Sequence, residues 1–183
     1  MKLHTSLLIT SVVVLSLLSC NNSDKRRKEH VSKGKFSISL PAGMRPDVSL
    51  HPTADFQYSD QNDDRFLLIF KEEVDTVNKY RKGYDLETYV YNAKGFVAQA
   101  LDTVYRESKI EKQLGNNEYQ IYHTFGPYNN KKTTSDVYEV VAVTKTPNNY
   151  YQIIQWGLLE NWGVDSLIVY ENLKSFEVVG VVK

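Results

Sequence analysis

The chain has 183 residues, 42% of them hydrophobic and 24% charged, and its 22 basic and 22 acidic residues leave no formal net charge. This composition is that of a folded globular chain rather than a disordered one, and the absence of excess positive charge argues against a nucleic-acid partner. At this length we expect one hydrophobic core and therefore one domain. The single cysteine, Cys20, excludes an internal disulfide and a cysteine-based metal site.

The first twenty residues have the organisation of a bacterial export signal. Lys2 gives a positive start, and residues 7–18 form the apolar run LLITSVVVLSLL. This run is shorter than the roughly 20 apolar residues that a permanent membrane-spanning helix needs, so it predicts a signal-peptide core. The string Leu17-Leu18-Ser19-Cys20 resembles the bacterial lipobox. The resemblance implies cleavage after Ser19, diacylglycerol on the Cys20 sulfur, and usually an acyl chain such as palmitate on the new amino terminus.

These features predict three segments. Residues 1–19 are expected to be a lipoprotein signal peptide, residues 20–33 a lipidated cysteine with a flexible basic tether, and residues 34–183 the folded domain. The basic run at 25–28 suits a solvated spacer, and contact with anionic lipid headgroups is the alternative interpretation. The predicted location is the bacterial cell envelope, with the domain outside the cytoplasm, in the periplasm or at the cell surface.

Strand patterns dominate the first part of the domain. Residues 35–40, KFSISL, alternate between apolar and polar and predict a first strand. Residues 44–54 contain two prolines and no hydrophobic period, which predicts a loop. Residues 55–59 alternate again, and residues 65–71, RFLLIFK, are apolar on both faces. Together, residues 55–59 and 65–71 predict a hairpin whose second strand is covered on both faces.

Two later segments have helical spacing. From Asp85 to Val104, apolar residues recur at intervals of three and four, which predicts an amphipathic helix with Asp85 as its N-cap. The charged residues 73–84 before it are expected to be a loop. A second helix is expected to begin near Gly163 or Asp165 and to end near Lys174. Its inward residues are expected to be Leu167, Ile168 and Leu173.

Between these helices the sequence predicts four strands joined by short connections. The expected strands are residues 108–114, 118–125, 136–145 and 150–157, with a loop at 126–134. Short turns between successive strands are typical of an antiparallel meander. Consecutive apolar residues in the last two strands indicate that layers cover both faces.

The order of these elements and several short strings carry a family resemblance. The strings are FSISLPAGM at 36–44, YQIY at 119–122, residues 150–156 and LKSF at 173–176. They resemble the PsbP/DcrB-like family, which includes photosystem extrinsic proteins and small bacterial lipoproteins. The resemblance covers residues 34–178. It implies an α+β fold, an αβα sandwich with a central antiparallel sheet of about six to seven strands and helices on both faces. It also implies binding or assembly beside a membrane rather than catalysis.

The sequence lacks the motifs of the common site chemistries. His51 and His123 stand alone without the spacing of a zinc site, and His123 is expected on a strand surface or rim. The acidic residues at 60–64 do not match a calcium-binding loop. No nucleophile elbow, phosphate loop or dinucleotide fingerprint occurs. We therefore expect no enzyme activity, no metal and no cofactor.

Aromatic residues are unusually frequent, with thirteen tyrosines beside two tryptophans. Their rings have apolar bodies and polar tips, which suit core packing, protein interfaces and ligand sites. Because alternate strand positions point to opposite faces, at least half of the strand aromatics are expected to pack under helices. The candidates for contact with a partner are Tyr122, Tyr128, Tyr151 and Trp162.

Three functional hypotheses follow, in order of preference. The first is a membrane-anchored extracytoplasmic lipoprotein whose domain binds or assembles an envelope protein partner and exposes an aromatic patch. The second is a small-ligand-binding lipoprotein with a closed pocket of roughly 300 Å³ or more, lined by the aromatics. The third is a hydrolase with a dispersed pair of carboxylates facing each other in a cleft.

Overall fold

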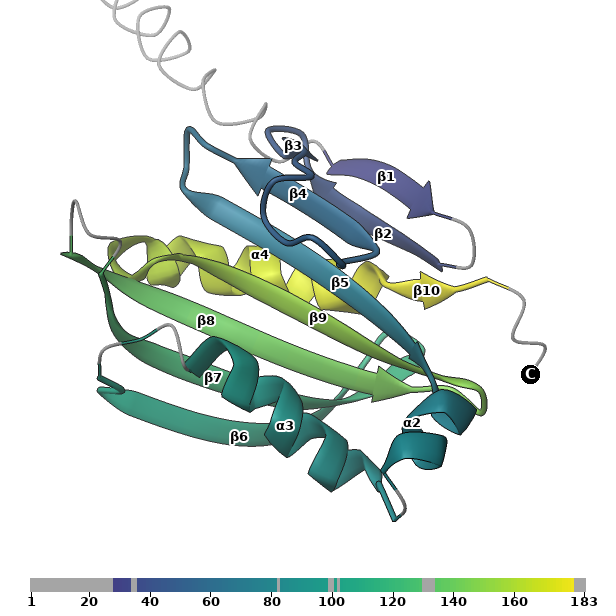
Figure 1. The fold of residues 1–183 in the computed structure, drawn as a ribbon. Helices are drawn as coiled ribbons and strands as arrows, with labels where there is room; N and C mark the ends of the chain where they lie inside the picture. Colours follow the sequence, from purple (N-terminus) through teal and green to yellow (C-terminus); the bar gives the residue numbers. More distant parts are fainter. Residues whose placement is uncertain are drawn as a thin grey trace, which may run out of the picture.

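The computed structural model describes residues 28–33, 36–81, 83–98, 101, 103–129 and 134–179. Seven strands form the main antiparallel sheet, in the order β3-β4-β5-β9-β8-β7-β6 (Figure 1). They are β3 (Arg45–Pro46), β4 (Phe56–Asp60), β5 (Arg65–Glu73), β6 (Arg106–Leu114), β7 (Asn117–Asn129), β8 (Thr134–Lys145) and β9 (Asn149–Leu158). The expected meander from β6 to β9 is confirmed.

Helices cover both faces of this sheet. The described helices are α2 (Val74–Tyr80), α3 (Leu86–Ala98), the short η2 (Leu159–Asn161) and α4 (Trp162–Ser175). In Figure 1, α3 lies in front of β7 and β8, and α4 lies behind the sheet. A second sheet has the order β1-β2-β10 and consists of β1 (Lys28–Lys33), β2 (Phe36–Pro41) and β10 (Glu177–Val178). The expected α+β sandwich, with seven strands in its main sheet, is therefore confirmed.

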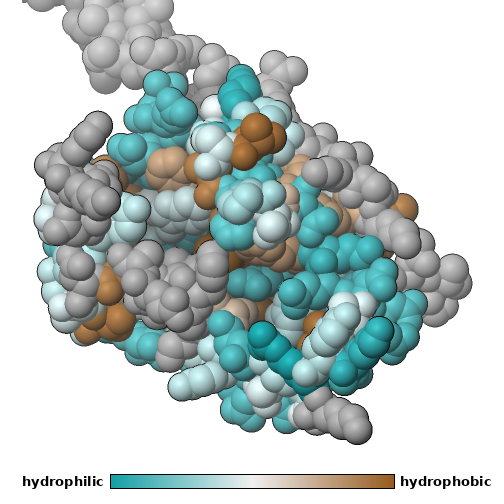
Figure 2. Space-filling model, in the orientation of Figure 1, coloured by the Kyte–Doolittle hydropathy of each residue, from teal (hydrophilic) through white to brown (hydrophobic). Residues whose placement is uncertain are grey.

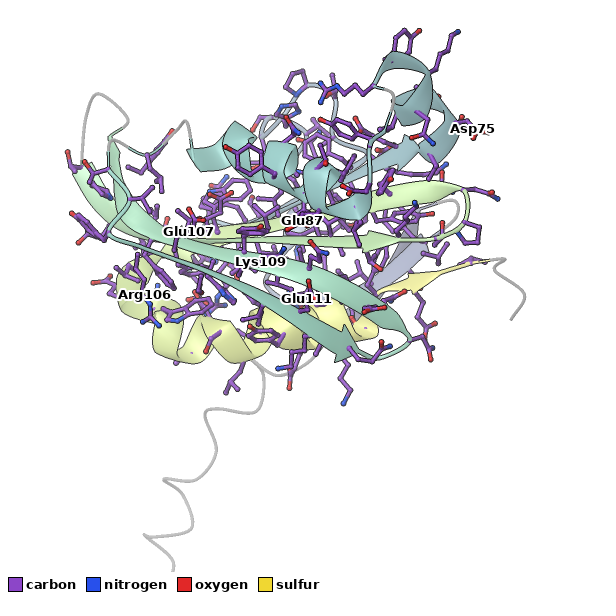
Figure 3. All side chains as sticks on the ribbon, turned by 90° about the horizontal axis from the view of Figure 1, so that it is seen from below. Asp75, Glu87, Arg106, Glu107, Lys109 and Glu111 are labelled. Atoms are coloured by element: carbon purple, nitrogen blue, oxygen red, sulfur yellow. The ribbon has the colours of Figure 1, made fainter. Side chains whose placement is uncertain are left out.

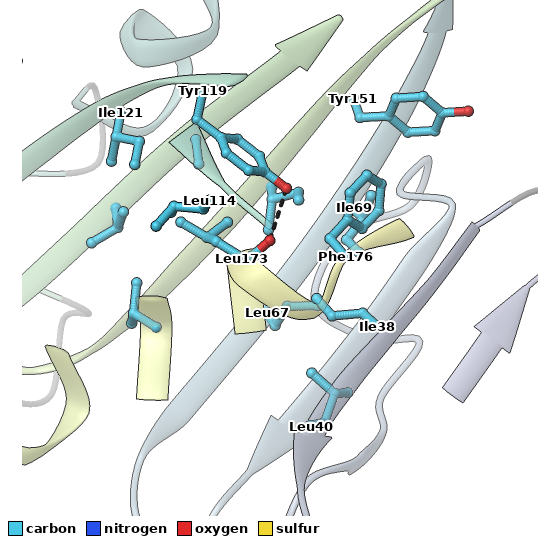
Figure 4. Packing of buried hydrophobic residues seen from close by; sticks show 14 of the residues in the cluster. Ile38, Leu40, Leu67, Ile69, Leu114, Tyr119, Ile121, Tyr151, Leu173 and Phe176 are labelled. Carbon is cyan, nitrogen blue, oxygen red and sulfur yellow. Dashed lines mark hydrogen bonds between the residues drawn. The ribbon is translucent and has the colours of Figure 1, made fainter. Parts of the chain in front are cut away.

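The larger core lies between the main sheet, α4 and β2. Phe36, Tyr151 and Phe176 form a cluster of rings whose centroids are 5.4 to 6.0 Å apart. The Tyr119 hydroxyl, buried in the same core, donates a hydrogen bond of 3.0 Å to the Leu173 carbonyl (Figure 4). Burying each large apolar side chain contributes roughly 1.5–3 kcal/mol. This core holds the second sheet and α4 against the main sheet.

A smaller core lies between α3 and the opposite face of the sheet. Tyr89 of α3 stacks on Tyr150 of β9 with ring centroids 4.2 Å apart, and Val90 is fully buried beside them. The Asp85 carboxylate accepts a hydrogen bond of 2.8 Å from the Thr88 backbone N–H, so the expected N-cap is confirmed. The helix thus starts where the sequence predicts, and Tyr89, Val90 and Ala93 of its predicted stripe are buried.

Strand β5 illustrates why some segments are apolar at consecutive positions. Leu67 and Ile69 point into the α4-side core, while Leu68 points into the α3-side core. The strand pairs with β4 and β9 along its edges, and the two cores cover its two faces. The prediction of a strand covered on both sides is confirmed.

A buried ionic network ties α4 to the β4–β5 hairpin. Asp165 is completely buried, and its carboxylate accepts hydrogen bonds from Arg65 Nε at 2.7 Å and from the Tyr138 hydroxyl at 3.0 Å. Asp63 also binds Arg65, at 2.8 Å. A buried carboxylate requires such partners because its desolvation costs several kcal/mol. The network therefore fixes where the first turn of α4 lies on the sheet.

Charged side chains line the free edge of the main sheet. Among the described strands, β6 pairs with β7 alone, and Figure 3 shows Arg106, Glu107, Lys109 and Glu111 along it. Lys109 Nζ lies 3.1 Å from the Glu87 carboxylate of α3 and 4.0 Å from that of Glu111. Charges on an edge strand oppose unwanted pairing with other chains. This edge is therefore protected against adventitious sheet extension.

The prediction of a flexible tether at 20–33 is wrong for residues 28–33. Residues 28–33 form β1, which pairs antiparallel with β2 from Lys28 opposite Pro41 to Lys33 opposite Phe36. An edge strand is held by backbone hydrogen bonds and needs no apolar period of its own, so the polar sequence gave no indication of it. The remaining tether residues and Cys20 lie outside the described residues.

Other element boundaries also differ from prediction. Residues 74–80, expected to be loop, form α2, and Val74 and Val77 pack against the α3-side core. Helix α3 ends at Ala98 instead of Val104, and Leu101 forms an isolated bridge with Tyr128. The expected loop at 126–134 is shortened because β7 runs to Asn129 and β8 begins at Thr134. A two-residue strand, β3, interrupts the expected loop at 44–54.

Helix α4 presents a different face to the sheet than its apolar spacing predicts. Leu173 is buried as expected and Ile168 is half-buried, but Leu167 is 69% exposed. Two polar residues, Asp165 and Asn172, occupy inward positions because they have buried hydrogen-bond partners. Hydrophobic spacing cannot identify such positions. None of the helices in the described ranges has the length and hydropathy of a membrane-crossing segment.

Candidate functional site

The structure separates the four aromatic residues that the sequence suggested for partner contact. Tyr151 is fully buried and Tyr122 is 8% exposed, so both belong to the cores and their assignment to a contact surface is corrected. Trp162 is half-buried and packs on Tyr138 with ring centroids 4.8 Å apart. Tyr128 is 41% exposed. Strand alternation fails here as a guide to exposure because both faces of the sheet are covered.

His123 is buried, which corrects its predicted position at a strand surface or rim. Its Nδ1 lies 3.2 Å from the Ser108 hydroxyl, and its Nε2 lies 3.0 Å from the Tyr170 hydroxyl of α4. Burial, and then the positive charges of Arg106 and Lys112, lower the pKa of His123. The imidazole links α4 to the β6–β7 hairpin, and both ring nitrogens are engaged in this contact.

The concave surface of interest lies on the α3 side of the sheet, around α2. It consists of two hollows that share Glu72, Arg81 and Tyr84. The outer hollow, of about 490 Å³, is lined by Lys71, Glu72, Glu73, Thr76, Val77, Tyr80, Arg81 and Tyr84. The inner hollow, of about 300 Å³, is lined by His51, Thr53, Phe70, Glu72, Arg81, Tyr84, Tyr89, Asn92, Ala93 and Gln152.

The chain reversal between α2 and α3 positions the shared residues. Helix α2 ends at Tyr80, and the Arg81 backbone N–H still bonds to the Val77 carbonyl at 2.9 Å. Gly83 has a φ of 82°, a left-handed conformation that glycine adopts without steric cost. The chain then enters α3 after Asp85. Arg81 and Tyr84 are thereby placed between the two helices, at the mouth of both hollows.

Aromatic rings form the walls of the inner hollow. Tyr84 meets Tyr89 edge-on, with centroids 6.5 Å apart, and the ring of Phe70 meets that of His51 edge-on at 5.0 Å. Burial, and then the negative charge of Glu72, raise the pKa of Tyr89. The walls are held by stacking inside the core, because Tyr89 itself packs on Tyr150. The hollow is therefore preformed rather than created by flexible surface side chains.

A neutral amide lies at the base of the inner hollow. Gln152 is directly opposite Phe70 in the pairing of β5 with β9, and it is only 9% exposed. Its side-chain amide forms no hydrogen bond with any group in the part of the chain that the structure describes. The Gln152 amide is not among the fully enclosed polar atoms that lack a partner, so it reaches the surface of the hollow, where water can bond to it. Gln152 is thus a polar group directed at the hollow without a protein partner.

Two opposite charges stand at the rim. Arg81 donates a hydrogen bond to the Tyr84 hydroxyl, and its guanidinium lies 5.2 Å from the centre of that ring. Among the described residues, neither Glu72 nor Arg81 forms an ion pair, with the other or with a third residue. The lining of the inner hollow therefore includes one carboxylate, which interacts with Tyr89, and one guanidinium, which donates to Tyr84.

The metal-ligating side chains of the described residues are dispersed over the fold. No group of three His, Cys, Asp or Glu side chains in the described ranges could hold a metal ion. The carboxyl with the strongest perturbation, Glu139, is 2% exposed, and its Oε1 has no hydrogen-bond partner. Burial alone raises the pKa of Glu139 to about 8. Because no second charge contributes, Glu139 does not form the carboxylate pair that the hydrolase hypothesis requires.

Sequence reasoning missed every residue that defines the inner hollow. One indication was present: Gln152 interrupts the apolar run of β9 in the string YYQIIQW at 150–156. A polar residue at a covered strand position needs a partner or a function. Phe70 and Arg81 carried no such indication, because their roles depend on the pairing of β5 with β9 and on the reversal after α2.

Comparison with protein-family models finds no match, and no curated protein matches either. Solved structures do match. Cyanobacterial PsbP (CyanoP) from Synechocystis is 14% identical with a TM-score of 0.52, and the match covers 87% of this chain and 97% of that one. The Ran-binding protein Mog1p of Saccharomyces cerevisiae is 13% identical with a TM-score of 0.54, over 84% of this chain and 96% of that one.

A third similar structure is LpqN of Mycobacterium tuberculosis, described as involved in cell envelope biogenesis. It is 13% identical with a TM-score of 0.52, and the match covers 84% of this chain and 91% of that one. Likeness at such low identity establishes a shared fold. The chain therefore has a PsbP-like fold, an α+β sandwich of the kind that CyanoP and Mog1p also have.

Proposed function

We propose that this chain is a membrane-anchored lipoprotein of the bacterial cell envelope whose domain binds an envelope protein partner and catalyses no reaction. The observation that carries the proposal is the surface cluster around the outer hollow, in which Tyr80 and Arg81 are exposed and Tyr84 is half-buried. Further support comes from the names of the similar structures, since Mog1p is a Ran-binding protein and LpqN is involved in envelope biogenesis.

The cluster has the chemistry of a protein contact site. Tyr80 is 75% exposed, with the Lys79 ammonium 5.6 Å from its ring centre, and α2 has no buried residue. Tyrosine and arginine are enriched among residues that dominate binding energy, because they offer large contact area and directed hydrogen bonds. Figure 2 shows that this face is mostly hydrophilic with small hydrophobic spots, which is compatible with a non-obligate interface.

The proposed anchor places the domain close to the membrane. Seven residues, 21–27, separate Cys20 from the first residue of β1. A fully extended chain spans at most about 3.6 Å per residue, so this connection reaches about 25 Å. Two or three acyl chains on Cys20 would hold it stably in a bilayer. A partner would then be bound within a short distance of the membrane surface.

Site-specific crosslinking in native membranes tests the proposal. A photoreactive amino acid is placed at position 80, at position 128, or at position 167, where Leu167 is 69% exposed on the opposite face of the sheet. We expect a discrete crosslinked product from position 80 and none from position 167. Tyr128 stays a proposed contact, and its position is tested in parallel. Equal products from positions 80 and 167, or none from position 80, would contradict the assignment of the surface.

The anchor is tested separately with Cys20→Ala. We expect this variant to lose metabolic labelling with palmitate and to leave the membrane fraction, while its domain still folds. Labelling that persists in the variant would refute lipidation at Cys20.

The second candidate function, small-ligand binding, is favoured by one specific observation. Gln152 directs an unpartnered amide into a hollow of about 300 Å³ with aromatic walls. Pockets of roughly this volume are at the lower end of those that hold small ligands. The expected lining, however, was the strand aromatics, whereas the observed walls come from β5, α3 and the connection before it.

A further inference from the structure

We propose that the inner hollow binds a zwitterionic ligand of dipeptide size, with its peptide bond on Gln152, its carboxylate on Arg81 and its ammonium group near Glu72. The inference rests on the small-ligand function, and it specifies the chemical class of that ligand. It shares Arg81 and Tyr84 with the protein contact proposed around Tyr80, whose own test probes position 80, a residue that does not line the inner hollow.

The base of the hollow selects for a neutral polar group. An amide side chain offers one acceptor and two donor hydrogens, and the peptide bond offers the complementary donor and acceptor. Gln152 is 91% removed from solvent, as its exposure is 9%, and has no hydrogen-bond partner among the described residues. A ligand amide would supply the missing hydrogen bonds. A purely apolar ligand would leave them unmade, which disfavours a fatty acyl chain.

The rim selects for a ligand with both charges. Arg81 is held by its hydrogen bond to Tyr84, with the guanidinium over the ring, and its planar donor group suits a carboxylate. Glu72 lines the same hollow as Tyr84 and Tyr89. A phosphate or other multiply charged anion is disfavoured, because Glu72 would repel it. A ligand with one positive and one negative end matches both.

The walls and the size set the remaining limits. Phe70, Tyr84 and Tyr89 come from different elements and offer apolar surface to a ligand side chain. A volume of about 300 Å³ is near the minimum for a ligand pocket, which limits the ligand to one or two residues. Asn92 also lines the hollow, and its Nδ2 donates a hydrogen bond of 2.7 Å to the Thr88 carbonyl.

The test uses the isotopically labelled full chain in a detergent without a sugar headgroup. The probes are alanyl-phenylalanine, its N-acetylated form, its C-terminal amide and glucose, and the readout is the NMR signal of the Gln152 side-chain amide. We expect a saturable shift with alanyl-phenylalanine and an at least tenfold weaker response to each capped form, since each loses a charge-assisted hydrogen bond. Glucose should give no saturable shift.

Ligand-matched variants make the assignment specific. Arg81→Met should weaken binding of the free dipeptide about tenfold but leave binding of the C-terminal amide unchanged. Glu72→Gln should weaken binding of the free dipeptide about tenfold but leave binding of the N-acetylated form unchanged. Gln152→Met keeps the side-chain length and should weaken binding of all peptide probes. Because this variant lacks the Gln152 side-chain signal, its binding is followed on the backbone amide signal of Ala93, which lines the same hollow. The controls Arg106→Met and Glu118→Gln remove exposed charges elsewhere and should change none of these affinities.

Two results would overturn the inference. If free and capped dipeptides shift the Gln152 signal with equal affinity, Arg81 and Glu72 do not bind the charged ends of the ligand. The zwitterion assignment is then wrong. If glucose gives the saturable shift while the dipeptides do not, the small-ligand function stands but this ligand class falls. No saturable shift with any probe would count against the small-ligand function as well as the dipeptide ligand class. The protein contact at Tyr80 would still be decided by its own crosslinking experiment.

Discussion

Replacing Glu139 with glutamine should remove a strong pH dependence from the stability of the fold. Glu139 lies on β8 opposite Trp156 of β9, is 2% exposed, and has an Oε1 without a hydrogen-bond partner. Its carboxyl pKa is raised by burial from the ordinary value of 4.5 to about 8. The folded protein therefore keeps this proton under conditions in which the unfolded chain has released it.

The sign and size of the effect follow from proton linkage. Between pH 4.5 and pH 8 the unfolded chain binds fewer protons at this site than the folded one, so the free energy of unfolding falls as the pH rises. The stabilising contribution is complete below pH 4.5 and is lost as the pH rises through about 8. Each unit of pKa difference corresponds to about 1.4 kcal/mol, so the total is on the order of 5 kcal/mol.

Urea unfolding followed by tryptophan fluorescence at a series of pH values from 4 to 9 measures this dependence. Glu139→Gln cannot ionise, so its stability relative to the wild type should rise by several kcal/mol across the series. The buried amide hydrogens of the new side chain add a cost that does not vary with pH. Glu118→Gln, at an exposed position of β7, should run parallel to the wild type. Parallel curves for Glu139→Gln and wild type would refute the reasoning.

Three further predictions concern the contacts that hold α4 and the turns. The pKa of His123 is lowered, so its contribution to the free energy of unfolding is complete above pH 6.5 and is lost as the pH falls below that value. His123→Phe should abolish this loss of stability at acid pH, which is measured as the difference between urea midpoints at pH 7 and pH 5. Arg65→Met leaves Asp165 buried without its cation and should cost about 3–5 kcal/mol in urea unfolding, and a loss below about 1 kcal/mol would contradict the role of the network. Gly115→Ala should lower the melting temperature by several degrees, because φ is 58° and a Cβ would lie 2.3 Å from the Lys174 carbonyl oxygen. Gly163→Ala, where a Cβ meets nothing within 4 Å, is the control and should be neutral or mildly stabilising.

Patterns set by covered sheet faces and helix caps were predictable from the sequence. The consecutive apolar residues of β5 and β9 predicted strands covered on both sides, and Asp85 predicted the start of α3. The turn at Thr146 to Asn149 was also predicted, and the Thr146 N–H bonds to the Asn149 carbonyl at 2.8 Å. Each of these features depends on residues close together in the chain.

Features that depend on tertiary partners were not predictable. Helix α2 has seven residues, too few for a hydrophobic period, and it is held by packing of Val74 and Val77. The inward positions of Asp165 and Asn172 on α4 depend on hydrogen bonds to other elements. The inner hollow depends on the register that sets Phe70 opposite Gln152, and no local pattern specifies the pairing of two strands so distant in sequence.

The hairpin of β1 and β2 determines how the domain responds to a pull from its N-terminal side. Lys28 lies opposite Pro41, at the open end of the hairpin, and Lys33 lies opposite Phe36 beside the connection. Tension entering at Lys28 would therefore peel β1 away one hydrogen bond at a time, which takes less force than shearing all of them together. Releasing its six residues would add about 20 Å of slack. Strand β1 would thus yield under load first and shield the seven-stranded sheet from mechanical stress.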